Sequence, residues 1–532
     1  GDFWNSWISP YVYGPAAKAA DAEILLDFWA TRPLPTSFAT PGDSWYLGDL
    51  YQALACGTSK ATALCQTPGF VADFILDRTL DPAVADFGLE GFRCIDPTCG
   101  SGHFLLYVFD LLLEIYREAW SEPRNWTSSE TGNTIRHDYP TLDELNAALP
   151  ELIIRHNLFG VEIDPRAVQV ASFALWLRAQ RAWLELRVQR NARRRIEHSH
   201  IILAEAMPGD ERLVREFAKQ VAHPVLAGLF EKVVAAFQLA GDLGLMLRVE
   251  RALEDAIREA ERGTRQSELF GSAQTTRAFW DSAENQLLGE LSRFAAGAPG
   301  KDHERRRLFR HDSAHGLALL DAARTRFDVV VMNPPFGDVS APSKDYVEGA
   351  YPDSRQDIFA VFVDRCVREL APTGFVGVIS TEAGFYRRTL EPWRRHVLLA
   401  ASRMEVMAHL GGHVLDGATV RVAAYALACG SKTGTSLYLR LLGEGKVSRE
   451  PSMQQAIESV RSGTPSERVF STDQREFEKL PYAVFGYWCS PELRDAFVNH
   501  PVLEGNAGRA RQGLATADDF RFLRLRWEVK DD

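Results

Sequence analysis

Short apolar runs recur along the chain, and each ends at a turn or at the start of a helical pattern. The run from Phe327 to Met332 is rich in β-branched residues and has no side suited to water. Similar runs occupy residues 92–96, 158–163, 200–205, 374–380 and 420–428. Continuous runs of this length are typical of strands buried on both faces of a sheet. Helical patterns from Phe104 to about Trp120 and from Arg166 to about Arg187 follow the first two runs, so an α/β fold is expected.

Four residues, Asn333-Pro334-Pro335-Phe336, follow the run that ends at Met332. Neither proline can donate a hydrogen bond to a sheet, so the strand must stop there in a rigid turn. In open α/β sheets, ligands bind at the carboxyl ends of strands. An Asn oxygen and a proline carbonyl can each accept one N–H of an exocyclic amine, and the ring can stack on a planar base. An isolated turn of this kind can equally be an ordinary loop.

A glycine-bearing turn, Asp96-Pro97-Thr98-Cys99-Gly100-Ser101-Gly102, lies between the first strand and its helix. Glycines let the backbone approach a ligand, and the following helix offers N–H groups and a positive dipole end. The turn is neither a P-loop nor a complete dinucleotide-binding pattern. Cys99 is expected to fill space rather than act as a nucleophile, because no His at a suitable spacing would activate it.

Carboxylates follow the next two strands. Glu162 ends the second strand, and a carboxylate there can accept hydrogen bonds from ribose hydroxyls. Asp164 precedes Pro165 and is expected to cap the next helix. Glu205 ends the third strand and could accept a hydrogen bond from an adenine amine, although it could also be a plain surface residue.

Together these segments resemble the DNA adenine-N6 methyltransferases of the γ arrangement, which use S-adenosylmethionine (SAM). Residues 96–102 resemble the family's cofactor motif, residues 160–165 its second motif and residues 333–336 its catalytic motif. Gln66-Thr67-Pro68-Gly69-Phe70-Val71 resembles the Thr-Pro motif that closes over the methionine part of SAM. The resemblance covers roughly residues 45–430 and implies a Rossmann-like class I SAM-dependent methyltransferase sheet.

The resemblance also implies the site residues. The catalytic residues would be Asn333, Pro334, Pro335 and Phe336. The residues that bind SAM would be Thr67, Pro68, Asp96, Pro97, Thr98, Cys99, Gly100, Gly102, Glu162, Ile163, Glu205 and Ala206. No metal is implied.

The chain departs from the simplest members of this family in three places. Glu205 stands where Asp is usual. Residues 207–310 interrupt the domain with a segment whose Leu, Val and Ala spacing predicts helices. Leu415 stands where members often carry a Phe that supports the flipped base, so stacking on that side is not assured.

The larger pattern resembles the long methylases of BREX and DISARM phage-defence systems. They share the helical insertion and a stretch like residues 510–522, which leads into a target-recognition region. We therefore divide the chain into a helical lead-in (1–44), the first half of the methyltransferase domain (45–206), the insertion (207–310), the second half (311–430) and the start of a target-recognition or C-terminal region (431–532).

The function implied is site-specific methylation of a flipped-out adenine in double-stranded DNA, for host marking in a defence or restriction-modification system. Other subunits of such a system are expected partners. A protein glutamine methyltransferase, which uses a similar Asn-Pro-Pro-aromatic turn, and a SAM-binding scaffold with little turnover are the alternatives. A fused nuclease is not expected, because only Glu528-Val529-Lys530 resembles a fragment of a nuclease motif.

Composition refines this picture. The 532 residues suggest two or three domains. The seven cysteines include no C-x-x-C pair, which argues for reduced thiols and against zinc. No apolar stretch reaches membrane-spanning length and the start is no signal peptide, so a cytoplasmic protein without membrane contact is expected. The first residue is not Met, which suggests a trimmed chain.

The net charge of −11 is unusual for a protein that binds DNA by neutralising phosphates. Basic residues gather at 178–195 and 301–310, but such runs are most often solvated, and we assign neither to DNA. Much of the DNA affinity is therefore expected to come from outside this chain or from a partner.

Overall fold

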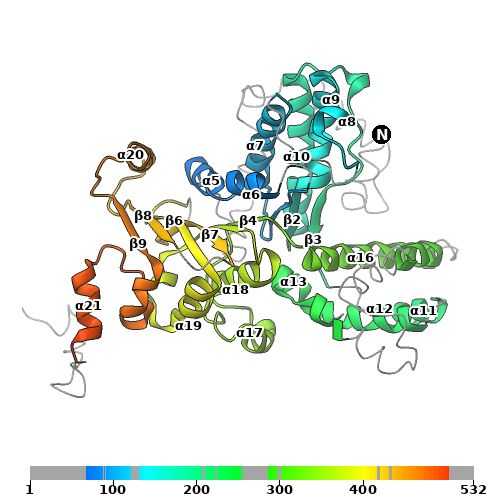
Figure 1. Cartoon of the computed structure of the whole chain (residues 1–532). Coiled ribbons are helices and arrows are strands. Elements are labelled where there is room, and N and C mark those ends of the chain that lie inside the picture. Colours follow the sequence, from blue (N-terminus) through cyan, green and yellow to red (C-terminus); the bar gives the residue numbers. More distant parts are fainter. Residues whose placement is uncertain are drawn as a thin grey trace, which may run out of the picture.

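The computed structural model describes residues 67–501, apart from 88, 90, 122–130, 207–209, 222–223, 253, 256–285, 296–300, 416–419 and 431–433. The expected lead-in at 1–44 and the stretch at 510–522 lie outside the described residues. A nine-stranded sheet in the order β3-β2-β1-β4-β5-β7-β6-β8-β9 forms the centre of the described part (Figure 1). The strands are β1 (Cys94–Asp96), β2 (Leu158–Glu162), β3 (His200–Leu203), β4 (Val329–Met332), β5 (Phe375–Thr381), β6 (Ser402–Gly411), β7 (Val422–Cys429), β8 (Thr435–Arg440) and β9 (Val469–Asp473).

The strand order places the ligand-binding edge. Strands β3, β2, β1, β4 and β5 are parallel, and β7 runs antiparallel between β5 and β6. The chain moves outward from β1 to β2 and β3, then returns to the other side of β1 as β4. Open α/β sheets bind ligands at such a reversal. The expected Rossmann-like α/β sheet is confirmed.

Side chains of the central strands alternate between two cores. In β4, Val329 and Val331 face one core, whereas Val330 and Met332 face the other, and all four are fully buried. This alternation explains the continuous apolar run, because a strand with helices on both sides has no face in contact with water.

Helices cover both faces (Figure 1). One face carries α5 (Gly69–Leu76), α6 (Leu80–Phe87), α7 (His103–Ser121), α9 (Leu142–Leu152), α10 (Pro165–Glu185) and α20 (Arg449–Ser462). The other carries α17 (Lys344–Ala350), α18 (Ile358–Arg365), the π-helix η9 (Cys366–Leu370) and α19 (Glu391–Trp393). The predicted helices 104–120 and 166–187 are α7 and α10, each within two residues at its ends.

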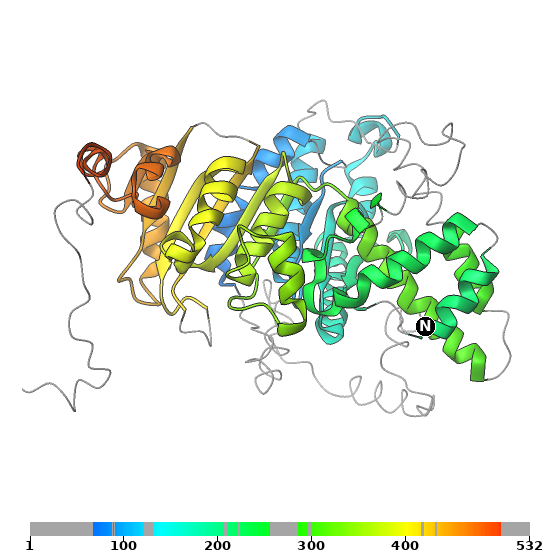
Figure 2. The ribbon, with the colours of Figure 1, turned by 90° about the horizontal axis from the view of Figure 1, so that it is seen from below.

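The insertion is helical where it is described, with α11 (Glu211–Gln220), α12 (Pro224–Ala236), the short α13 (Ala240–Leu243) and α16 (Lys301–Arg324). These helices lie beyond β3, at the opposite end of the sheet from β8, β9 and α21 (Pro491–Asn499) (Figure 2). Strands β8 and β9 continue the same sheet past residue 430. The division of the chain at that residue stays a prediction. None of the helices in the described residues is long and apolar enough to span a membrane.

Candidate active site

The turn predicted to bind SAM (residues 96–102) and the turn predicted to be catalytic (residues 333–336) meet at one edge of the sheet. We call them the cofactor turn and the catalytic turn. Asp96 ends β1 and Asn333 follows β4, and these two parallel strands are hydrogen-bonded neighbours. Glu162 ends β2 on the other side of β1. Parallel strands present their carboxyl ends together, so the three predicted clusters of site residues lie on the same edge.

The turn after β1 is shaped by its glycines. Gly100 and Gly102 have φ of +52° and +88°, which side-chain-bearing residues rarely adopt. A Cβ on Gly102 would lie 3.2 Å from Cβ of Ala171 in α10, whereas a Cβ on Gly100 would meet nothing within 4 Å. Gly100 therefore borders open space, as expected of backbone that a ligand approaches.

Cys99 serves packing, as the sequence indicated. The thiol is buried, and burial raises its pKa well above the ordinary value, so it stays protonated. A Cβ on Gly160 of β2 would lie within 3.0 Å of Sγ of Cys99. A glycine in β2 is thus what lets the turn sit against the sheet.

Glu162 is held by main-chain donors. Its Oε2 accepts from Gly100 N–H (2.9 Å), and its Oε1 accepts from the N–H groups of Ile163 (2.8 Å) and Asp164 (3.0 Å). Burial raises its pKa, and the three N–H groups oppose that rise. A carboxylate has about four acceptor positions, so three main-chain bonds leave capacity for about one ribose hydroxyl.

The pKa of Asp96 is perturbed more strongly than that of Glu162. Its Oδ1 accepts from Thr98 N–H at 3.0 Å. Burial raises the pKa of Asp96 to about 8, and repulsion from Glu162 adds to the effect. A ligand with positive charge, such as the sulfonium of SAM, would favour the ionised form of this carboxyl group.

Asp164 caps α10, as predicted, because its side chain accepts from Arg166 N–H at 2.9 Å. Between Glu162 and this cap, Ile163 is 47% exposed. An exposed aliphatic side chain beside the carboxylate predicted to bind ribose offers an apolar surface for the adenine of a nucleoside.

Residues 241–246 of the insertion lie beside the predicted cofactor site, a contact that the sequence did not reveal. We call this segment the wall. The 3-10 turn η7 (Gly244–Met246) follows α13, and a Cβ on Gly244 would lie 3.7 Å from Cγ2 of Ile163. A Cβ on Gly241 in α13 would lie 4.0 Å from the main-chain N of Ala206. Two glycines of the insertion therefore approach two residues expected to bind SAM. The only available signal was the Gly241-Asp242-Leu243-Gly244 spacing.

This wall is fastened to the catalytic half of the domain. Asp242 accepts hydrogen bonds from Ser340 (3.2 Å) and Ser343 (3.3 Å), which follow the catalytic turn. The main-chain oxygens of Leu245 and Met246 accept from Arg365 (3.1 Å) and Tyr351 (2.7 Å).

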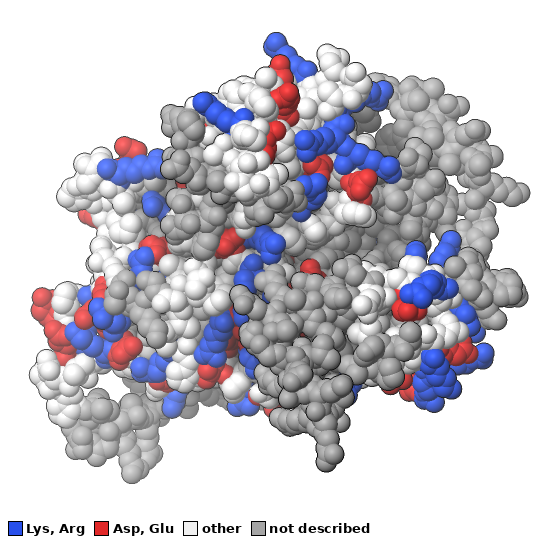
Figure 3. Space-filling view, turned by 45° about the vertical axis from the view of Figure 1, so that its right-hand side comes forward, with Lys and Arg blue, Asp and Glu red and all other residues white. Residues whose placement is uncertain are grey.

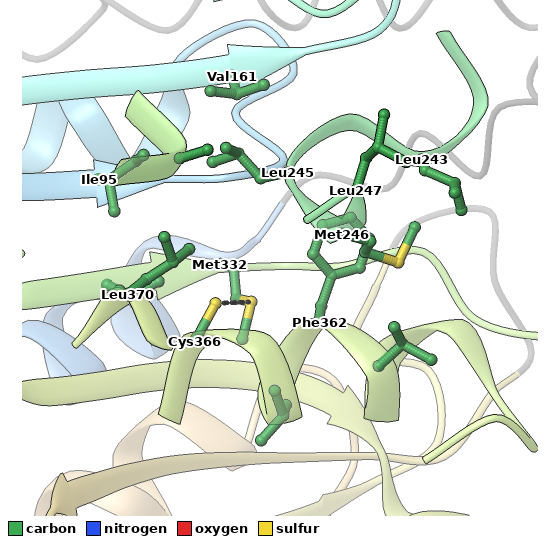
Figure 4. Close-up of a cluster of buried hydrophobic side chains, with 14 of the residues drawn as sticks. Ile95, Val161, Leu243, Leu245, Met246, Leu247, Met332, Phe362, Cys366 and Leu370 are labelled. Atoms are coloured by element: carbon green, nitrogen blue, oxygen red, sulfur yellow. Dashed lines mark hydrogen bonds between the residues drawn. The ribbon is translucent and has the colours of Figure 1, made fainter. Parts of the chain in front are cut away.

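The apolar side of the wall continues the core. Figure 4 shows Leu245 and Met246 beside Ile95 of β1, Val161 of β2 and Met332 of β4, and all five belong to one buried cluster. The wall is thus held by packing below the site as well as by hydrogen bonds beside it.

Glu205 lies beside the same wall. Its Oε1 is 3.0 Å from Nδ1 of His315 in α16, the last helix of the insertion. Thr67 and Pro68 lie at the start of α5, where Pro68 is the N-cap residue. All the predicted cofactor residues lie in the described part of the chain, and their contact with SAM stays a prediction.

The catalytic turn contacts the Thr-Pro motif directly. Nδ2 of Asn333 donates to Oγ1 of Thr67 at 3.2 Å, across 266 positions of sequence. This bond joins the turn at Asn333 to the start of α5. Phe336 packs against both apolar cores at the sheet edge. Gly337 N–H donates to Asp357 at 2.8 Å and fixes the end of the turn. Leu415 is 2% exposed and lies in one of the cores that Phe336 contacts.

Each of the two basic runs includes arginines that are paired with carboxylates. Arg178 lies 2.5 Å from Asp110, and Arg305 lies 2.7 Å from Asp210. On the face in Figure 3, basic and acidic side chains are interspersed. No group of His, Cys, Asp or Glu within the described ranges is arranged to hold a metal ion.

The residues fit SAM in chemical character. Buried or partly buried carboxylates at Asp96 and Glu162 suit a sulfonium and a ribose, open backbone at Gly100 suits close approach, and Ile163 suits adenine. When bound, SAM would supply the methyl group, and the residues of this chain would orient it toward the turn at Asn333.

Comparisons with known proteins match this chain to DNA methylases. Residues 156–414 match the Eco57I restriction-modification methylase model, and residues 86–207 match the MmeI DNA-methyltransferase domain. The adenine-specific methyltransferase PglX of Lacticaseibacillus casei (strain Zhang) is 23% identical over 453 residues, which are 83% of this chain and 32% of PglX. The adenine-specific methyltransferase BrxX of Escherichia coli O9:H4 (strain HS) is 24% identical over 453 residues, 82% of this chain and 32% of BrxX.

Among solved structures, a chain of a type I R-M system is 14% identical, with a TM-score of 0.43, over 91% of this chain and 74% of that chain. This chain spans about a third of the length of PglX and of BrxX. The resemblance inferred from the motifs is confirmed: the chain is similar to restriction-modification methylases of the Eco57I and MmeI kind and to the adenine-specific methyltransferases PglX and BrxX.

Proposed function

We propose that this chain transfers the methyl group of SAM to N6 of an adenine in double-stranded DNA. The observation that carries the proposal is the position of Asn333. It follows β4, next to the β1 turn expected to bind SAM, and its amide N–H is directed to Thr67. The amide oxygen of an asparagine at this position can accept a hydrogen bond from the N–H of an exocyclic amine.

The chemistry follows from the adenine amine. The lone pair of N6 is delocalised into the ring, so the nitrogen is a poor nucleophile. Hydrogen bonds from N6–H to the Asn333 oxygen and the Pro334 carbonyl favour a tetrahedral nitrogen and localise that lone pair. A methyl group of SAM held near this turn would then be within reach of that lone pair. The sulfur would leave as a neutral thioether, and the methylated nitrogen would release one proton to water. Positioning of the two reactants would contribute much of the rate.

Reaching this turn requires that the adenine leave the duplex. Phe336 is partly buried between the two cores, so its ring is held in place and can stack on the base. Leu415 is buried in one of these two cores, and a leucine can supply apolar contact without aromatic stacking.

Marking of host DNA in a phage-defence or restriction-modification system, with other subunits of that system as partners, is the setting we propose. Its support is the similarity to PglX and BrxX, over about a third of their length.

The test is methylation of a mixed DNA library with labelled SAM, followed by mapping of the modified bases. We expect label only at adenine N6 within a fixed sequence. Label on protein glutamine instead of DNA, or SAM binding without any transfer, would contradict the proposal.

A further inference from the structure

A surface next to the catalytic turn combines exposed aromatic rings with arginines. Strands β6 and β8 are parallel to each other and, through the antiparallel β7, to β5. Their carboxyl ends therefore lie on the same edge as Asn333. The connection is direct, because Asp357 accepts from Gly337 N–H (2.8 Å) and lies 3.9 Å from Arg387, which follows β5.

Two aromatic side chains on this surface are exposed and lie under arginines. Trp488 is 40% exposed, and the guanidinium of Arg440, at the end of β8, lies 5.2 Å from its ring centre. Tyr482 is 39% exposed, and the guanidinium of Arg388 lies 4.8 Å from its ring centre. Such pairs present a flat apolar face and a positive charge together.

A buried polar network holds the rings between these pairs. Tyr386 stacks on His409 of β6 with 5.7 Å between ring centres, and its ring centre lies 5.9 Å from that of Trp488. His409 is 3% exposed and lies 2.5 Å from Glu382 and 2.9 Å from the hydroxyl of Tyr487. Trp488 is thus attached to a rigid base rather than to a free loop.

A buried arginine fastens the two turns that carry the other pair. Arg394 is 0% exposed and donates to main-chain oxygens of Gly384 (2.7 Å) and Arg387 (2.9 Å) in one turn. It also donates to the oxygens of Tyr482 (2.9 Å) and Ala483 (3.1 Å) in the other turn. Burial lowers the pKa of Arg394 to about 10.

The second turn is strained. Tyr482 and Ala483 have φ of +58° and +50°, a conformation that non-glycine residues seldom adopt. Strain of this kind persists where the surrounding structure imposes it, and it concentrates at functional sites. Here, Arg394 holds both carbonyls, and the result is an exposed Tyr482 ring next to Arg388.

We propose that these six residues, Tyr386, Arg387, Arg388, Arg440, Tyr482 and Trp488, form a platform that binds DNA beside the target adenine. The arginines would contact phosphates, and the exposed rings would stack on a nucleotide exposed when the duplex opens. This inference rests on the proposed function, because a DNA adenine must reach Asn333 for the platform to lie beside it.

A nucleic acid fits this surface better than a protein segment does. Base stacking on aromatic rings tolerates any sequence, and arginine suits phosphate. The chain as a whole has a net charge of −11, which opposes DNA binding. The platform would place positive side chains at the edge of the sheet where DNA must bind. Arg421, also on this side, lies 2.7 Å from Glu382, a closer ion pair than that of Arg387 with Asp357 (3.9 Å), and is left out of the platform for that reason.

The experiment measures binding of the whole 532-residue chain to a short fluorescent duplex at low salt, with and without one unpaired central adenine. Trp488→Ala should weaken binding to the duplex with the unpaired adenine by roughly tenfold. Trp488→Phe should retain most of the affinity, because it keeps a ring. Arg388→Gln should lower the slope of log affinity against log salt by about one.

Arg475→Gln is the matched control. It removes the same charge from an exposed site just after β9, at the opposite edge of the sheet, and should leave DNA affinity unchanged. Thermal melting and SAM titration of each variant separate a folding defect from a binding defect.

If Trp488→Ala and Arg388→Gln bind DNA as Arg475→Gln does, the platform is wrong, even when the parent methylates adenine. If the parent methylates no adenine but these variants still lose DNA affinity selectively, the proposed function fails and the platform is supported. If the variants keep their DNA affinity but lose binding to a protein partner, the DNA-binding platform is also overturned.

Discussion

The two halves of the catalytic edge are built in different ways. In the cofactor half, at β1 and β2, carboxylates are held by main-chain N–H groups and shaped by glycines. In the other half, at β5, β6 and β8, a buried histidine and a buried arginine are held by side chains and carbonyls from distant segments. The first half is built mainly from main-chain groups of turns on adjacent strands, whereas the second depends on side chains that reach between separate segments.

This difference matches what each half would bind. A single small cofactor can be recognised by one turn whose backbone is fixed, because the ligand never changes. DNA presents a long and variable surface, and a set of separately supported side chains can be altered one at a time. Variants in each half should therefore separate cofactor binding from DNA handling.

The largest effect on methyl transfer is expected for Asn333, which lies between the two halves. Asn333→Ala should lower methyl transfer by ~100-fold or more while SAM affinity stays within a few-fold, because the lost contact acts on the target amine in the transition state. Single-turnover kinetics and SAM titration measure the two quantities. Unchanged kinetics would remove Asn333 from the catalytic assignment.

In the cofactor half, Glu162→Ala should weaken SAM binding by about 1.5–3 kcal/mol, the range for hydrogen bonds to a charged group. The matched control is Asp164→Ala, which removes the cap of α10 and should cost about 1 kcal/mol of stability without a comparable loss of SAM affinity. Calorimetry on both variants decides between them, and a larger loss with Asp164→Ala would move the ribose contact there.

Asp96 gives a pH test of the same half. Its folded pKa is about 8, above the ordinary 3.8, so the folded SAM-free protein keeps a proton that the unfolded chain releases. Stability should therefore fall as pH rises from about 4 toward 8, by at most about 1.4 kcal/mol for each unit.

Asp96→Asn removes this loss. Thermal melting without SAM should show that the stability of the variant relative to the parent increases from pH 5 to pH 8. A constant difference in stability across that range would argue against a protonated Asp96. SAM should bind the parent more tightly as pH rises, since the sulfonium favours the carboxylate.

The smallest effect concerns the wall from the insertion. Asp242→Asn should weaken its contacts with Ser340 and Ser343 and raise KM for SAM a few-fold, consistent with about 0.5–1.5 kcal/mol for hydrogen bonds. Asp210→Asn makes the same change at the N-cap residue of α11, where Asp210 lies 2.7 Å from Arg305, and this control should leave KM unchanged. Equal effects of both variants would mean that the insertion acts only through general stability.

The sequence predicted the cofactor half better than the other half. The strands β1 to β5 and β7 are apolar runs, and their polar ends are neighbours because the strands are parallel. By contrast, β6 contains Arg403, Glu405 and His409, which pair with other side chains and interrupt the apolar pattern. Nothing local to Trp488 or Tyr482 indicates that either residue would lie near β5, since the link is made by Arg394 and His409.

The same reasoning explains the missed wall. A Gly-Asp-Leu-Gly sequence inside a helical insertion has no local signature of ligand contact. Its role depends on Ile163 and Ser340, which lie about eighty and one hundred positions away in the chain.

The segment around Gly241 and Gly244 also bears on attempts to shorten this chain. A deletion that joins residue 206 directly to residue 311 would look harmless, because both ends lie near β3 and the sheet itself would keep every strand. It would, however, remove the turn that lies against Ile163 and the acceptor for Ser340 and Ser343. Protein engineers should therefore trim the insertion only at its distal helices, α11 and α12, and retain residues 240–252.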